Sequence, residues 1–124
     1  MRPLVLASLL LAACSGPPAP DAVLCRDVIH RLCFGPVCGV VSTQLGVTSS
    51  QLGVTPECET KLLANTGCAS DEFAFTTPTR AHFLSCRGPL VQVSASTEVP
   101  PLCDSVGEMF SNCPDVVHFL GGTP

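Results

Sequence analysis

Apolar side chains recur at helical spacing along several segments of the chain that end at glycine or proline. The clearest segment spans residues 22–33, where one helix face carries Leu24, Cys25, Val28, Ile29 and Leu32. Asp21 precedes this segment as a capping residue, and Gly35-Pro36 follows it as a stop signal. The pattern predicts an amphipathic helix.

Proline at the first helical position and glycine after the last predict further helices along the chain. Their ranges are 36–40, 56–66, 78–87, 100–112 and 115–120. Thr55-Pro56 and Thr77-Pro78 are the start signals of the second and third of these. Strand signals are weak, with a short alternation at 91–93. We therefore predict an all-α fold, a small disulfide-rich bundle of five or six short helices.

The N-terminal segment has a different pattern. Arg2 supplies one positive charge, an apolar run follows from Leu4 to Ala13, and small residues end it. This order is typical of a secretory signal peptide, and the run is shorter than the roughly 20 residues that a transmembrane helix needs. Residues 1–13 are therefore expected to be removed after export.

The end of that run, Leu11-Ala12-Ala13-Cys14, resembles the lipobox of bacterial lipoproteins. The resemblance implies that Cys14 is lipidated and becomes the first residue of the mature chain, which is then anchored in a membrane. It also implies the outer membrane, because Asp is the inner-membrane retention signal of this family and Ser15 stands in its place. Residues 14–20 then form the lipidated cysteine and a proline-rich tether, and residues 21–124 form the folded domain.

Composition narrows the function of this domain. The formal net charge is −4 and no basic cluster is present, which argues against a nucleic-acid partner. The chain has no Trp and no Tyr, so the usual stacking platforms are missing, and its six Phe are expected in the core.

The nine cysteines fit this reading of the N-terminus. Once Cys14 carries lipid, an even number remains, which in an exported domain predicts four disulfides. The paired residues are Cys25, Cys33, Cys38, Cys58, Cys68, Cys86, Cys103 and Cys113.

Helix geometry excludes some pairings. Cys58 and Cys68 would lie about 15 Å apart on one helix, whereas a disulfide needs Cα atoms within about 7 Å. The same argument excludes Cys103–Cys113 and Cys25–Cys33, and it favours bridges to a neighbouring antiparallel helix. Cys33–Cys38 across the turn stays open.

Two kinds of repeat occur in the chain. Residues 42–48 and 49–55 are a tandem duplication, which we interpret as a lengthened surface loop. The Cys-x9-Cys segments 58–68 and 103–113 are related by 45 residues. Either the domain is an old duplication of a helical unit, or similar helices look alike.

Two Asp-x-x-His pairs are weak candidates for metal ligands: Asp27 with His30, and Asp115 with His118. Residues three apart lie on the same helix face, although such pairs are usually ordinary surface contacts. Paired Cys-x-x-Cys zinc motifs are absent, and an oxidising compartment turns thiols into disulfides. We therefore expect no metal and no cofactor.

Sequence motifs of catalysis are also missing. The chain has no G-x-S-x-G elbow, no phosphate-binding glycine loop, no H-E-x-x-H and no Cys-x-x-Cys redox pair. We expect a non-enzymatic domain.

The chain as a whole resembles the short cysteine-rich lipoproteins of myxobacterial type, which have no assigned activity. The resemblance implies a lipid-anchored domain with a binding or structural role in the cell envelope and an unknown partner. Two alternatives stay open, namely a metal or small-ligand carrier and a hydrolase without a visible motif.

Overall fold

The computed structural model describes residues 19–47, 56–91 and 99–121. The predicted signal peptide, most of the tether and the second half of the tandem repeat lie outside these residues. Over the described residues the fold is all-helical, without a strand, as predicted. The helices are α2 (Asp21–Cys33), α3 (Gly39–Leu45), α4 (Pro56–Thr66), α5 (Arg80–Arg87), the 3₁₀ turn η1 (Gly88–Leu90), α6 (Cys103–Asn112) and α7 (Pro114–Phe119).

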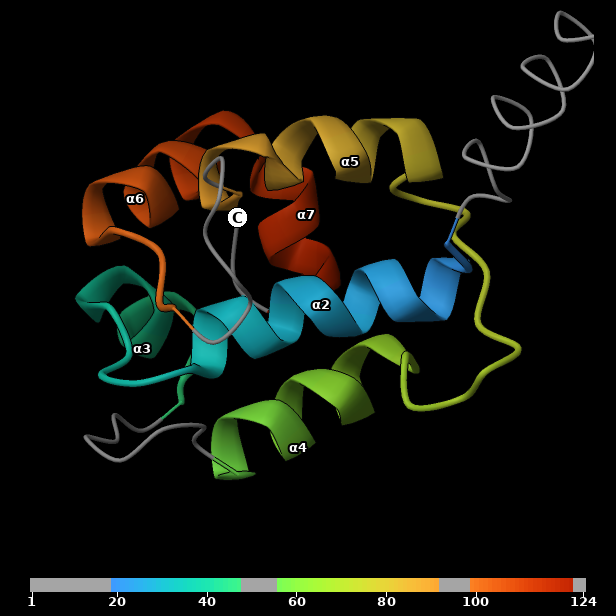
Figure 1. Ribbon diagram of the computed structural model, residues 1–124, viewed down its shortest axis with the longest axis horizontal. Coiled ribbons are helices and arrows are strands. Elements are labelled where there is room, and N and C mark those ends of the chain that lie inside the picture. The colour runs from blue at the N-terminus through green and yellow to red at the C-terminus, as the bar shows by residue number, and fades with distance from the viewer. Residues whose placement is uncertain (1–18, 48–55, 92–98, 122–124) are drawn as a thin grey trace, which may run out of the picture.

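Helix α2 lies in the middle of the molecule, with α4 along one side and α5, α6 and α7 on the other (Figure 1). Its predicted apolar face is buried throughout, from Leu24 to Leu32. Burial extends further than one face, because Ala22 and Arg31 are also covered. The less covered side is a narrow stripe of Val23, Arg26, Asp27 and His30.

The core combines the aliphatic side chains of α2, α6 and α7 with a cluster of phenylalanines. Phe83 is fully buried, and Phe75 stacks against it with ring centroids 4.5 Å apart. Phe73 and Phe119 complete the cluster, with centroid separations of 5.0–6.1 Å to their neighbours. The segment before α5 therefore packs against the core through its aromatic residues. Five of the six Phe lie in or against the core as expected, but Phe34 does not, and for it the expectation is wrong.

Four disulfides pair all eight of the predicted cysteines: Cys25–Cys68, Cys33–Cys58, Cys38–Cys103 and Cys86–Cys113. The three pairings excluded by helix geometry are not formed, and the open pairing Cys33–Cys38 is not formed either. Two bridges join α2 to the antiparallel α4 region, one near each end, as expected for cysteines at both ends of a helix. Each bridge contributes about 2–4 kcal/mol by restricting the unfolded chain.

The two Cys-x9-Cys segments differ in their bridges. Both cysteines of the α4 region pair with α2, whereas Cys103 pairs with Cys38 and Cys113 pairs with Cys86. The disulfide pattern therefore does not repeat, and the duplication of a helical unit stays a hypothesis.

Several helix ends differ from the predicted ones. Helix α5 begins at Arg80, because the Thr79 hydroxyl accepts the capping hydrogen bond from the His82 N–H. Helix α3 begins at Gly39 and continues to Leu45, where Gly46 ends it in the left-handed conformation (φ 64°). Helix α6 begins at Cys103, after the two prolines.

Candidate functional site

A groove of about 400 Å³ lies between α2 and α4. Its walls are Val23, Arg26, Asp27, Ile29 and His30 of α2 and Glu59 and Leu63 of α4. Residues 23, 26, 27 and 30 share one face of α2, and residues 59 and 63 share one face of α4, because side chains three or four apart on a helix are neighbours. The open stripe of α2 is thus one side of the groove.

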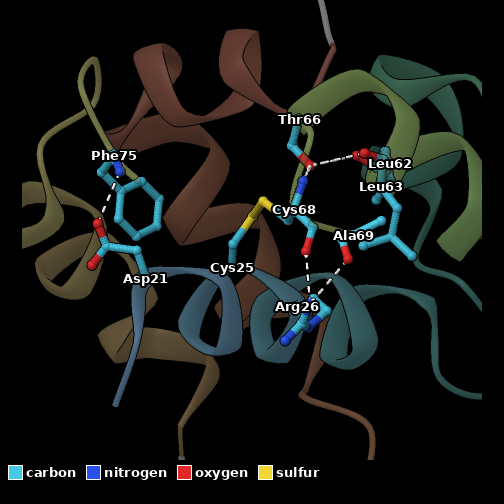
Figure 2. Close-up of a disulfide and its surroundings, with 9 residues drawn as sticks. All are labelled: Asp21, Cys25, Arg26, Leu62, Leu63, Thr66, Cys68, Ala69 and Phe75. Atoms are coloured by element: carbon cyan, nitrogen blue, oxygen red, sulfur yellow. Dashed lines mark hydrogen bonds between the residues drawn. A yellow bond between two sulfur atoms is a disulfide. The ribbon is translucent and has the colours of Figure 1, made fainter. Parts of the chain in front are cut away.

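Arg26 is fixed at the groove by the loop that follows α4. Its guanidinium donates to the carbonyl oxygens of Cys68 and Ala69, at 3.1 and 3.3 Å (Figure 2). The neighbouring Cys25–Cys68 disulfide holds this loop against α2 (Figure 2). The guanidinium also pairs with Asp71 at 3.0 Å, but the Asp71 side chain is 90% exposed, so water screens this pair strongly.

His30 pairs with Glu59 across the groove. The distance from His30 Nδ1 to Glu59 Oε2 is 2.9 Å, and both side chains are about 30% exposed. The Phe34 ring lies 5.6 Å from the imidazole, centroid to centroid. The pair therefore links the two walls and gives the groove a polar end.

Asp27 forms ion pairs with two arginines inside the fold. One of its carboxylate oxygens accepts from Arg31 Nε at 3.0 Å and from Arg87 at 2.8–2.9 Å. Arg31 is 5% exposed and also donates to the Leu90 carbonyl. Asp27 thus neutralises a buried guanidinium and joins α2 to α5, and Arg31 joins α2 to η1.

The second predicted Asp-x-x-His pair lies elsewhere, on α7. Asp115 contacts His82 of α5, with 2.8 Å between Asp115 Oδ2 and His82 Nε2. Partial burial would raise the pKa of Asp115, but the hydrogen bond and charge of His82 outweigh it and lower that pKa. His118 lines a separate cavity of about 400 Å³ together with Phe119 and Thr77.

The structure therefore divides the four candidate metal ligands between two places. Asp27 and His30 line the α2–α4 groove, whereas Asp115 and His118 line the cavity at α7. The members of the predicted pairs contact other residues: Asp27 contacts two arginines, His30 contacts Glu59, and Asp115 contacts His82. A single site made of all four residues is not formed.

Sequence reasoning missed His82. Its Nε2 atom lies 3.5 Å from Cys86 Sγ, one helical turn later, and the ligand atoms of His82, Cys86 and Cys113 all lie within 4.8 Å of one another. The His82-x3-Cys86 spacing was a visible signal, but its link to Cys113 and Asp115 depends on tertiary structure. Glu59 was missed for the same reason.

These features define a class, namely a small all-helical domain held by four disulfides. Such a density of disulfides indicates an oxidising compartment outside the cytoplasm. Among the helices of the described ranges, none combines the length and the apolar character needed to cross a bilayer. No family model, curated protein or solved structure matches the chain.

Proposed function

We propose that this protein is a membrane-anchored lipoprotein whose helical domain binds a small ligand in the α2–α4 groove. The observation that carries the proposal is the groove itself, whose volume of about 400 Å³ falls within the usual size of small-molecule sites. Export, on which the anchor depends, agrees with the four disulfides.

The groove is built to keep its shape without a ligand. Cys25–Cys68 and Cys33–Cys58 join its two walls near opposite ends. A site that is rigid before binding loses less conformational entropy when the ligand enters. We therefore place the proposed ligand site in this groove.

The chemistry of the walls favours an apolar ligand with a carboxylate. Val23 and Leu63 provide apolar surface, and Arg26 provides a cation. The existing partner of Arg26 outside the groove, Asp71, is 90% exposed, so a ligand carboxylate can replace it at little cost. Glu59 is already matched by His30 and offers less to a ligand cation.

The anchor rests on the N-terminal residues, which lie outside the described part. Leu11-Ala12-Ala13-Cys14 supports lipidation of Cys14, and Ser15 supports the outer membrane. Two or three acyl chains hold a protein at a bilayer essentially permanently.

The four-residue metal carrier is not advanced as a second function, since its ligands lie in two cavities. The hydrolase alternative gains no supporting observation from the described side chains.

The ligand proposal is tested with three probes of equal chain length: octanoate, octylamine and octanol. Their binding to the mature domain is followed by chemical-shift changes of backbone amides. We expect octanoate to bind best and to shift amides of α2 and α4. Leu63→Trp, which fills the groove, should weaken octanoate binding about tenfold or more, corresponding to ~1.4 kcal/mol.

Leu102→Trp is the matched control, because Leu102 is 63% exposed and lies just before α6, outside the groove. It should bind octanoate as the unaltered domain does. The proposal fails if no probe shifts amides of α2 or α4, or if Leu63→Trp binds octanoate as well as the control does.

A further inference from the structure

One disulfide, Cys86–Cys113, has a histidine in contact with one of its sulfurs. Cys86–Cys113 is buried, with each cysteine 4–6% exposed, but a histidine and a carboxylate stand beside it at the surface. His82 Nε2 lies 3.5 Å from Cys86 Sγ and 2.8 Å from Asp115 Oδ2. The sulfurs, the imidazole and the carboxylate together are a ligand set that zinc prefers.

We propose that reduction of the Cys86–Cys113 disulfide creates a site in which His82, Cys86 and Cys113 bind Zn²⁺, with Asp115 as the fourth ligand. This site shares no residue with the α2–α4 groove. It therefore stands or fails independently of the proposed ligand binding.

The distances agree with tetrahedral coordination. Zinc lies at about 2.0–2.1 Å from nitrogen and about 2.3 Å from sulfur, which puts neighbouring N and S ligands about 3.6 Å apart. The observed separation of His82 Nε2 and Cys86 Sγ is 3.5 Å. All three ligand atoms lie within 4.8 Å of one another, so rotation of the cysteine side chains is sufficient to admit an ion.

Local structure keeps these ligands together after reduction. His82 and Cys86 are four residues apart on α5, so one helix face presents both. Cys113 and Asp115 stand at the junction of α6 and α7, and Val116 and Val117 N–H groups bond to the Cys113 carbonyl. The helices thus position both halves of the site without the S–S bond.

Solvent reaches the site from one side. A cavity of about 350 Å³ is lined by His82 and Asp115 together with residues 76–79. Both exposed ligands, His82 and Asp115, line this cavity, and the His82 imidazole contacts Cys86 Sγ. A cation entering from the cavity would meet Asp115 and His82 first.

The redox step balances with a thiol reductant. One thiolate of the reductant attacks a sulfur of the disulfide, the S–S bond breaks, and a mixed disulfide forms. A second thiolate releases the protein sulfur, so the reductant leaves as a disulfide and Cys86 and Cys113 have gained two electrons. Zn²⁺ then binds the two sulfurs as thiolates and displaces their two protons.

The test places the mature domain in glutathione redox buffers with and without Zn²⁺ alone. Free thiols are alkylated and each cysteine is identified by peptide mass spectrometry. Because Zn²⁺ binds only the reduced form, it should shift reduction of Cys86–Cys113 to a [GSH]²/[GSSG] ratio at least about tenfold lower. The other three disulfides should titrate as they do without zinc.

The comparison variants are His82→Ala and His118→Ala. His82→Ala should abolish the zinc-dependent shift, whereas His118→Ala should retain it, because His118 is not one of the clustered ligands. Because each variant is measured with and without zinc, an effect of the substitution on the disulfide itself does not enter the result. The proposal is overturned if zinc causes no shift, shifts another disulfide instead, or shifts Cys86–Cys113 equally in His82→Ala.

Discussion

At the scale of single residues, Asp27 illustrates how tertiary contacts decide what a side chain does. Its spacing to His30 made it a candidate ligand, yet its carboxylate accepts from both Arg31 and Arg87. Arg31 is one of the most buried charged side chains among the described residues, at 5% exposed. A buried guanidinium without a counter-charge costs free energy, so we assign Asp27 a structural role as the counter-charge of Arg31.

The substitution Asp27→Asn measures how much this contact contributes to the free energy of unfolding. The substitution keeps the shape of the side chain but leaves Arg31 without its carboxylate, and we expect a loss of about 3 kcal/mol in the free energy of unfolding. Asp71→Asn is the control, since Asp71 also pairs with an arginine but is 90% exposed, and it should cost less than about 0.5 kcal/mol. Urea denaturation measures both, and equal losses would contradict this role of Asp27.

At the scale of helices, the ends were harder to predict than the apolar faces. The face of α2 follows from a local periodicity, which the sequence displays directly. Asp21, by contrast, does not cap α2: its carboxylate accepts from the Phe75 N–H and pairs with Arg80 (Figure 2 shows the contact to Phe75). A partner 54 residues away can compete with a local cap, and no local pattern reveals it.

These contacts make the start of α2 sensitive to acid. The hydrogen bond from Phe75 N–H and the contact with Arg80 lower the pKa of Asp21 below its ordinary value of 3.8. A lowered pKa stabilises the fold above the unfolded pKa, and this contribution is lost as the pH falls through the folded pKa. Asp21→Asn should therefore be less stable than the unaltered domain at neutral pH, and the difference should shrink below about pH 4.

Urea midpoints measured at a series of pH values check this expectation. A difference that stays constant from neutral pH to pH 2 would show that the charge of Asp21 does not act in this way.

At the scale of the whole molecule, the number of disulfides could be predicted from the sequence, but their pairing could not. The parity of the cysteines predicted four bridges, and helix length excluded three pairings, because both depend on counting and on local geometry. The actual partners required the packing of α2 against α4 and of α5 against α7. The disulfide Cys86–Cys113, for instance, joins α5 to the junction of α6 and α7, and no spacing in the sequence specifies this pairing.

The α2–α4 groove was likewise only partly predictable from the sequence. The α2 stripe of Val23, Arg26, Asp27 and His30 is the side of the helix opposite its periodic apolar face, so it could be located from the sequence. The opposite wall, with Glu59 and Leu63, could not be assigned to it before the two helices were placed together. The proposed ligand site therefore depends on helix packing, which only the tertiary structure reveals.

The central claim is that export leaves one cysteine for lipid and eight for disulfides, and mass spectrometry of the protein isolated from its native envelope tests it most directly. The account predicts a mature chain that begins at Cys14, carries acyl groups there, and holds the four disulfides described above. A mature chain without acyl groups at Cys14, or one with its eight other cysteines as free thiols, would contradict it.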